Sequence, residues 1–176
     1  MTADRLIVRP ARTSDVSTIR TVVAPLAEQR VLLDKEAVVY YESIQEFLVA
    51  ESPDGRIAGF GALHVMWEDI AEVRTLATAP EWRGHGVGHL LLDALLDRAA
   101  ELGVHRVFCL TFETEFFGRH GFTVMADQSA VDPEVYSELL RSTDEGVAEF
   151  LDLARVKPNT LGNTRMILDL HSRARS

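Results

Sequence analysis

The chain has 176 residues, of which 47% are hydrophobic and 26% charged, and its formal net charge is −9 at pH 7. These values fit one folded domain with a buried core and exclude a disordered chain. The acidic charge disfavours nonspecific binding to nucleic acid, because the phosphate backbone would be repelled.

A single cysteine, Cys109, cannot form an internal disulfide, which favours a reducing compartment. The N-terminus carries no apolar signal region, and no apolar run is long enough to cross a bilayer. No Cys/His spacing indicates a metal site. We expect a cytoplasmic, single-domain protein over residues 1–176, with no membrane partner. Its core would span about 5–126, and its C-terminal helices and closing strand about 131–171.

The first half of the chain predicts two helices and four strands. A strand at 6–8 precedes a helix that begins near Asp15, and a second helix is expected over 35–44. Strands at 47–50 and 56–66 form a hairpin around the turn 52–55, where Pro53 presets the backbone angle and Gly55 accepts positive φ. The next strand covers 71–78 and ends before Pro80.

A long amphipathic helix follows the glycine-rich run 83–88. Its expected apolar face comprises Val87, Leu91, Leu92, Leu95, Ala99 and Leu102. Asp93, Asp97 and Glu101 line the opposite face, and Gly103 is expected to close the helix.

The second half predicts strands at 105–111, 122–125 and 165–170, with a short helix through Phe116 and Phe117 and further helices at 133–140 and 145–153. The strand–helix–strand order predicts a parallel pair inside a mainly antiparallel twisted sheet flanked by helices. The expected fold class is therefore α/β, of the α+β kind.

The run 83–88 is the most informative motif. Gly84, Gly86 and Gly88 let backbone N–H groups gather at the N-terminus of a helix, where a phosphate or pyrophosphate binds well. No Gly-Lys-Ser/Thr follows, so the run is not a P-loop, and it lacks the spacing of the dinucleotide fingerprint.

The pattern Arg-x-x-Gly-x-Gly resembles the coenzyme A loop of the GNAT family of N-acetyltransferases. The resemblance implies acetyl-CoA as acetyl donor, with its pyrophosphate held by Arg83, Gly84, His85, Gly86, Val87 and Gly88. It further implies that the backbone of Leu76, Ala77 and Thr78 pairs with the pantetheine arm. An amide near Leu76 would polarise the thioester carbonyl. We expect the His85 side chain to face solvent.

Glu72 is the candidate general base, because similar strands carry a glutamate base in some GNAT enzymes. Burial near an apolar wall can raise the pKa of such a carboxylate towards the working pH. The alternative is a strand glutamate paired with a neighbouring cation. Alternation would place Glu72, Arg74 and Leu76 on one face, so Arg74 either pairs with Glu72 or faces the substrate.

The general acid of many GNAT enzymes, a tyrosine before a Gly-Phe pair, is replaced here by Phe117 in Phe117-Gly-Arg-His-Gly-Phe122. Phe117 cannot donate a proton and instead walls the cofactor channel or packs the core. Either water protonates the departing thiolate, or Tyr40, Tyr41 or Tyr136 does so.

From about Leu6 to Leu170 the chain also resembles the acetyltransferase domain of N-acetylglutamate synthases. This likeness implies an amino-acid N-acetyltransferase of arginine biosynthesis, with glutamate as the small-molecule acceptor. Its two carboxylates need cations or donors beside them. The segments that match the family's substrate-binding segments, together with strand alternation, supply Lys35, Arg74, Thr164 and Arg165.

Two departures from that family leave alternatives open. The chain starts directly at the acetyltransferase, without the amino-acid-kinase-like domain that many such synthases carry. Gly162 stands where the family often has a basic residue, so glutamine is a competing acceptor. Other readings are a GNAT enzyme for a protein terminus or an antibiotic amine, and a sensor that binds acetyl-CoA without turnover. GNAT enzymes often dimerise through their last strands, which suggests a homodimer.

Overall fold

The computed structural model of the chain describes residues 5–126, 131–153 and 162–173. Contacts divide the chain into two compact units, Met1–His64 with Val73–Arg98 and Val65–Glu72 with Ala99–Ser176. The strand order is β1 (Ile7–Pro10), β2 (Phe47–Glu51), β3 (Ile57–Trp67), β4 (Ile70–Thr78), β5 (Arg106–Thr111), β7 (Thr164–Asp169) and β6 (Thr123–Val124). The parallel pair is β4 (Ile70–Thr78) with β5 (Arg106–Thr111). The expected mixed, mainly antiparallel sheet is thus confirmed, whereas the single-domain expectation stays a prediction.

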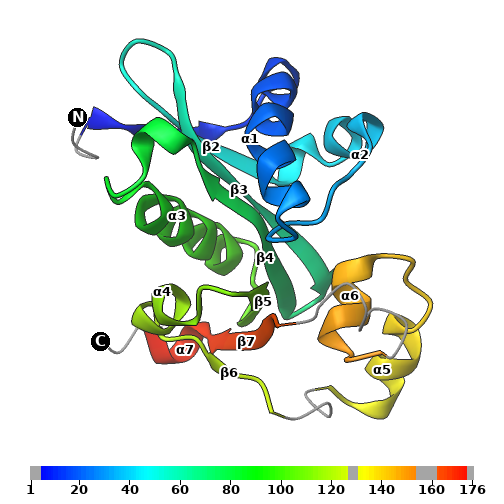
Figure 1. Ribbon diagram of the computed structural model, residues 1–176. Coiled ribbons are helices and arrows are strands. Elements are labelled where there is room, and N and C mark those ends of the chain that lie inside the picture. Colours follow the sequence, from blue (N-terminus) through cyan, green and yellow to red (C-terminus); the bar gives the residue numbers. More distant parts are fainter. Residues whose placement is uncertain (1–4, 127–130, 154–161, 174–176) are drawn as a thin grey trace. The chain divides into compact units, whose positions relative to one another are not determined.

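The first unit packs helices on both faces of its strands (Figure 1). Its elements are β1 (Ile7–Pro10), a 3-10 turn (Thr13–Asp15), α1 (Val16–Glu28), α2 (Ala37–Glu42), a 3-10 turn (Ile44–Glu46), β2 (Phe47–Glu51), most of β3 (Ile57–Trp67), the end of β4, a 3-10 turn (Pro80–Trp82) and most of α3 (Val87–Glu101). Helices α1 and α2 lie on the opposite side of β2 and β3 from α3. Val49 of β2 joins the α1 cluster and the adjacent Ala50 joins the α3 cluster, because side chains alternate along a strand.

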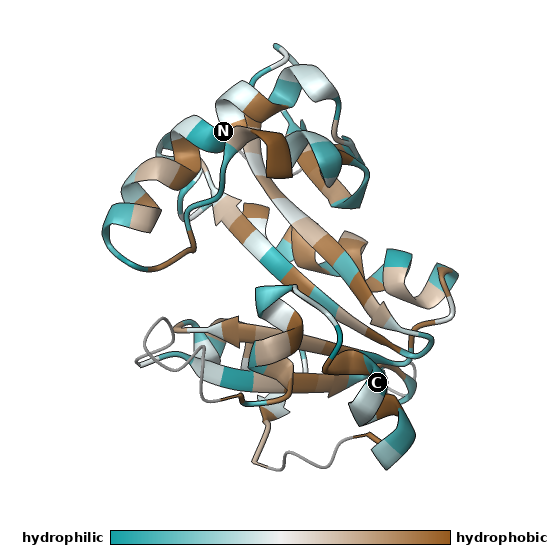
Figure 2. Cartoon of the chain, turned by 90° about the vertical axis from the view of Figure 1, so that its right-hand side faces the viewer, coloured by the Kyte–Doolittle hydropathy of each residue, from teal (hydrophilic) through white to brown (hydrophobic). Residues whose placement is uncertain are grey.

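Most of the predicted apolar face of α3 is buried, Leu91 and Leu95 included, and Ile19 and Val23 of α1 are buried as well. Leu102 is not, with 52% of its surface exposed, because it follows the last helical residue and lies in the turn that Gly103 closes with φ +86°. The helices in Figure 2 carry brown and teal residues side by side, as amphipathic helices do.

The second unit holds β5, the start of β4, and the C-terminal elements. These are α4 (Thr114–Arg119), β6 (Thr123–Val124), α5 (Pro133–Leu139), α6 (Glu145–Phe150), β7 (Thr164–Asp169) and α7 (Leu170–Arg173). Phe108 of β5 and Phe150 of α6 pack edge to face with ring centroids 5.4 Å apart. The sequence analysis did not anticipate α7. Among the described residues, no helix combines the length and apolar character needed to cross a membrane.

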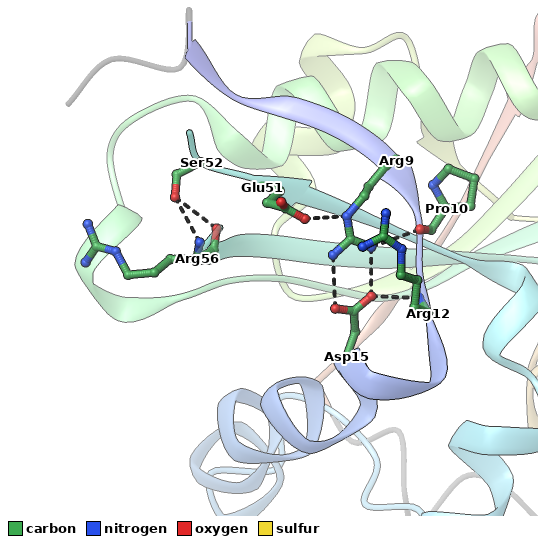
Figure 3. Close-up of polar contacts among 7 residues, drawn as sticks. All are labelled: Arg9, Pro10, Arg12, Asp15, Glu51, Ser52 and Arg56. Carbon is green, nitrogen blue, oxygen red and sulfur yellow. Dashed lines mark hydrogen bonds and ion pairs between the residues drawn. The ribbon is translucent and has the colours of Figure 1, made fainter. Parts of the chain in front are cut away.

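Arg9 ties β1 to the start of α1 and to β2 (Figure 3). Its Nη1 and Nη2 atoms donate to the two carboxylate oxygens of Asp15 at 2.8 and 3.0 Å, and its Nε donates to Glu51. The backbone N–H of Arg12 donates to Asp15 as well, at 2.6 Å. Asp15 is the N-cap residue of α1, but its carboxylate is turned towards these donors and caps no N–H group of that helix.

We expect Asp15→Asn to lower the free energy of unfolding by about 1–3 kcal/mol at pH 7, because Arg9 loses its main charged partner in a partly buried place. Burial raises the pKa of Asp15, but hydrogen bonds from Arg9 and Arg12 outweigh this and hold it below its ordinary value. Because the pKa of Asp15 is lower in the folded state than in the unfolded state, its carboxylate stabilises the fold fully above the unfolded-state pKa of about 3.9. This stabilisation is lost as the pH falls through the folded-state pKa.

Urea denaturation between pH 3 and pH 7 measures this difference between wild type and variant. Glu115→Gln is the matched control, because Glu115 also pairs with an arginine, Arg119, but on an exposed helix face. A difference for Asp15→Asn that stays constant down to pH 3 would contradict the linkage.

Candidate functional site

The glycine-rich run 83–88 joins the 3-10 turn Pro80–Trp82 to α3, whose first residue is Val87. Gly84 has φ +79° and Gly86 has φ +77°, backbone angles that favour glycine. A Cβ atom at Gly84 would meet nothing within 4 Å, so the requirement there is conformational rather than steric. The first-turn N–H groups of this 15-residue helix have no carbonyl partner within the helix, which makes its end a place for an anion.

Trp82 fixes the start of this loop, and the sequence analysis did not single it out. Its ring is 3% exposed and belongs to the cluster that contains Val87 and Leu91 of α3. His85 packs edge to face against it, with ring centroids 6.1 Å apart. His85 is therefore half-buried against Trp82 and does not simply face solvent, while Arg83 is exposed. An aromatic residue directly before the glycine run was the available signal.

Thr75 lies within β4, directly before the predicted pantetheine segment. Its φ is +54°, a strained angle for a β-branched residue and one that is enriched at functional sites. The parallel ladder with β5 joins residues Ile70, Ala71 and Glu72, so Leu76, Ala77 and Thr78 lie beyond it and beyond Thr75. Burial still alternates through this residue, with Arg74 and Leu76 half-buried and Thr75 buried, so the shared face of Glu72, Arg74 and Leu76 stays a prediction.

Two glycines of β3 allow α3 to pack closely beneath this segment. A Cβ atom at Gly59 would lie 2.8 Å from the carbonyl oxygen of Ala77 and 2.8 Å from Cγ1 of Val87. At Gly61 it would lie 2.9 Å from both Leu76 and Leu95 side chains. Because these two glycines have no side chains, β3 lies close both to residues 76–77 of β4 and to the side chains of α3.

We expect Gly59→Ala to destabilise the protein by about 1–3 kcal/mol. The new Cβ atom would clash with the backbone carbonyl of Ala77, which cannot move without disturbing the strand. Urea denaturation measures the loss. Gly118→Ala in α4 is the matched control, since a Cβ atom there meets nothing within 4 Å. Equal stability of the two variants would contradict the close packing of β3 on α3.

Glu72 lies in the second unit with 7% of its surface exposed, and it opposes Phe108 in the β4–β5 ladder. Burial raises the pKa of the Cys109 thiol, and the charge of nearby Glu72 raises it further. Cys109 is thus a buried and inert core thiol. Glu72 combines burial with charge, the combination that a general base in a strand requires.

Thr164 and Arg165 leave β7 on opposite faces. Thr164 opposes Thr111 and Arg165 opposes Leu110, while Glu72 shares its face with Phe108 and therefore with Leu110 and Arg165. Arg165 donates from Nε to the carbonyl of Glu149 at 2.9 Å and from Nη2 to the carbonyl of Phe150. Burial lowers the pKa of Arg165, against an opposing effect of the Glu149 charge. Sequence reasoning missed these carbonyl partners.

The other predicted acceptor residues lie in the first unit. Lys35 precedes α2 and is half-buried, and Arg74, also half-buried, directly precedes Thr75 in β4. Phe117 of α4 is 6% exposed and packs edge to face with Phe116 and Phe122, at 5.1 and 5.2 Å between ring centroids.

The three tyrosines differ in burial. Tyr40 is 1% exposed. Its burial and, to a smaller extent, the charge of Asp34 raise its pKa. Tyr41 is 49% exposed and Tyr136 packs beside the Phe108 cluster. Within the described part of the chain, no three His, Cys, Asp or Glu side chains gather as metal ligands would.

Comparison with known proteins gives matches along most of the chain. Residues 20–122 match the Acetyltransferase (GNAT) family. An amino-acid acetyltransferase of Mycobacterium tuberculosis (strain ATCC 25618 / H37Rv) is 55% identical over 168 residues, which cover 94% of this chain and 95% of that protein.

Solved structures also match most of this chain. Rv2747 from Mycobacterium tuberculosis, crystallised in complex with CoA and NLQ, has a TM-score of 0.88 at 55% identity, covering 93% of this chain and 98% of that one. N-acetylglutamate synthase from Neisseria gonorrhoeae, complexed with coenzyme A and N-acetyl-glutamate, has a TM-score of 0.75 at 26% identity. That match covers 94% of this chain but 35% of the synthase.

Proposed function

Because this chain belongs to the acetyltransferase (GNAT) family, we propose that it transfers the acetyl group of acetyl-CoA to the α-amine of glutamate or glutamine. The observation that carries the proposal is the likeness, along 94% of the chain, to an amino-acid acetyltransferase of Mycobacterium tuberculosis. With glutamate as acceptor, the reaction would be the first step of arginine biosynthesis.

The residues of the glycine-rich loop fit the donor substrate. Gly84 and Gly86 adopt positive φ directly before α3, and main-chain N–H groups at this helix end would hold the pyrophosphate. Arg83 and His85 add positive charge and a half-buried ring beside it. Leu76, Ala77 and Thr78 would pair with the pantetheine arm as an added strand. An N–H group near Leu76 would stabilise the oxyanion of the tetrahedral intermediate.

Glu72 would remove the proton that makes the amine nucleophilic, directly or through one water. The neutral amine attacks the thioester carbonyl, a C–N bond forms, and collapse of the intermediate breaks the C–S bond. The released thiolate takes a proton from water or from a tyrosine, since Phe117 has none to give. The side chain of Phe117 instead packs with Phe116 and Phe122.

The predicted substrate-binding residues would place positive charges and hydrogen-bond donors beside the carboxylates of the acceptor. Arg165 shares the face of Glu72 on the β4-β5-β7 ladder, and its carbonyl partners hold the guanidinium in place. Lys35 and Arg74 supply further positive charge and Thr164 a hydroxyl. A carboxylate beside such groups avoids the cost of burial without a partner.

A thiol-release assay with acetyl-CoA and a panel of amines tests this function. We expect turnover with glutamate or glutamine and none with an aminoglycoside or a peptide N-terminus. Turnover of another amine alone would replace the proposal with a different acetyltransferase. Saturable binding of acetyl-CoA in calorimetry without any turnover would replace it with a sensor.

A further inference from the structure

Trp82 is tied to the glycine-rich loop at two places. Its buried ring belongs to one core cluster with Val87 and Leu91 of α3, the helix that follows the loop. Within the loop, the N–H group of His85 donates to the backbone carbonyl of Trp82 at 3.3 Å, and the two rings pack edge to face. The residue that precedes the loop therefore constrains both the middle of the loop and the start of the helix.

The segment 82–85 forms a type II turn. Its second residue, Arg83, has φ −62° and ψ 140°, and its third, Gly84, has φ +79°, as this turn requires. The hydrogen bond from His85 to Trp82 joins the fourth residue to the first. Because the same two residues also contact each other through their rings, opening of this turn would break both contacts at once.

Without such constraints the loop would be flexible. Three of its six residues, 83–88, are glycines, and glycine loses more conformational freedom on ordering than any other residue. Gly84 and Gly86 are exposed, so little packing of their own holds them in place. A ligand that had to order this loop would bind more weakly by the free energy of that ordering. A loop that is already ordered avoids this loss.

We propose that Trp82 is a positioning residue for acetyl-CoA, because its ring orders the glycine-rich loop before the donor binds. The ring is 3% exposed, so it acts through the His85 ring and the first turn of α3 rather than by touching the donor. The main-chain N–H groups at the start of α3 are then held in one arrangement, in which they can converge on a diphosphate. This inference rests on the proposed role of the loop in donor binding.

The dissociation constant for acetyl-CoA tests this role, measured by isothermal titration calorimetry at a temperature where each variant is folded. Trp82→Leu removes the ring and should raise the dissociation constant about tenfold or more, because the donor must then order the loop. Trp82→Phe keeps an aromatic ring and removes an N–H group that has no partner among the described residues. Its dissociation constant should therefore stay within about threefold of wild type. At saturating acetyl-CoA, kcat should change by less than about twofold in either variant, because the effect lies in donor binding.

Hydrogen exchange of the ligand-free protein gives a second readout. Backbone amides of residues 83–88 should exchange faster in Trp82→Leu than in wild type, since local opening of the loop becomes easier. Saturating acetyl-CoA should restore most of the protection in the variant. Amides of β5 should exchange alike in the two proteins, because that strand lies in the other unit.

Trp67→Leu is the matched control, because it truncates the other tryptophan of the chain, which is half-buried beside the Phe108 cluster. It should lower stability and leave both acetyl-CoA affinity and the exchange of residues 83–88 unchanged. If Trp82→Leu does not fold, Trp82→Met fills more of the apolar space without a ring and carries the same expectation.

A Trp82→Leu protein that is less stable but binds acetyl-CoA with wild-type affinity would overturn the inference and leave the proposed function standing. Unchanged exchange of residues 83–88 in that variant would overturn it as well. Absence of saturable acetyl-CoA binding to wild type would instead remove the proposed function.

Discussion

Replacing Glu72 by glutamine should lower kcat by about 10²–10⁴-fold, the usual contribution of a positioned general base. Glutamine keeps the size of the side chain and the packing against its neighbours, but it cannot accept the proton of the attacking amine. The acidic limb of the pH–rate profile should vanish with the carboxylate. Steady-state kinetics between pH 5 and pH 10, with a thiol-release readout, measures both effects.

Glu149→Gln is the matched control, because Glu149 is a second buried carboxylate of the same unit, 4% exposed against 7% for Glu72. It should change stability while leaving the shape of the pH profile intact. Acetyl-CoA should bind Glu72→Gln with wild-type affinity, since the glycine loop is untouched. A Glu72→Gln enzyme with wild-type kcat and pH profile would remove Glu72 from the mechanism and leave it a structural glutamate.

Gly86→Val should weaken acetyl-CoA binding by at least about 100-fold. Gly86 has φ +77°, which costs a β-branched residue about 1–2 kcal/mol or more, so the loop would leave its present geometry. The N–H groups at the start of α3 would then no longer converge on one anion. Isothermal titration calorimetry with acetyl-CoA measures the loss.

Gly103→Val is the control that separates the effect of backbone strain from the loss of contact with acetyl-CoA. Gly103 has φ +86° and closes the other end of the same helix, so its substitution carries similar backbone strain. A Cβ atom there meets nothing within 4 Å. We expect Gly103→Val to lower stability and to bind acetyl-CoA normally. Equal affinity for the two variants would mean that the glycine loop does not hold the donor.

The sequence by itself determined the features that depend on neighbouring residues. The turn 52–55 follows from proline and glycine at fixed positions, and the apolar face of α3 follows from its period. The glycine run before α3 identified the candidate anion site, because helix ends and positive φ are local properties. The order of strands and helices was enough to predict the parallel pair.

Only the tertiary structure decided which distant groups meet. Thr164 and Arg165 are adjacent in sequence, yet β7 turns them to opposite faces, and Arg165 finds its carbonyl partners in α6. The positive φ of Thr75 likewise has no signal in composition or period. The physical reason is that burial and hydrogen-bond partners depend on chain segments brought together by folding, whereas patterns along the chain record only local geometry.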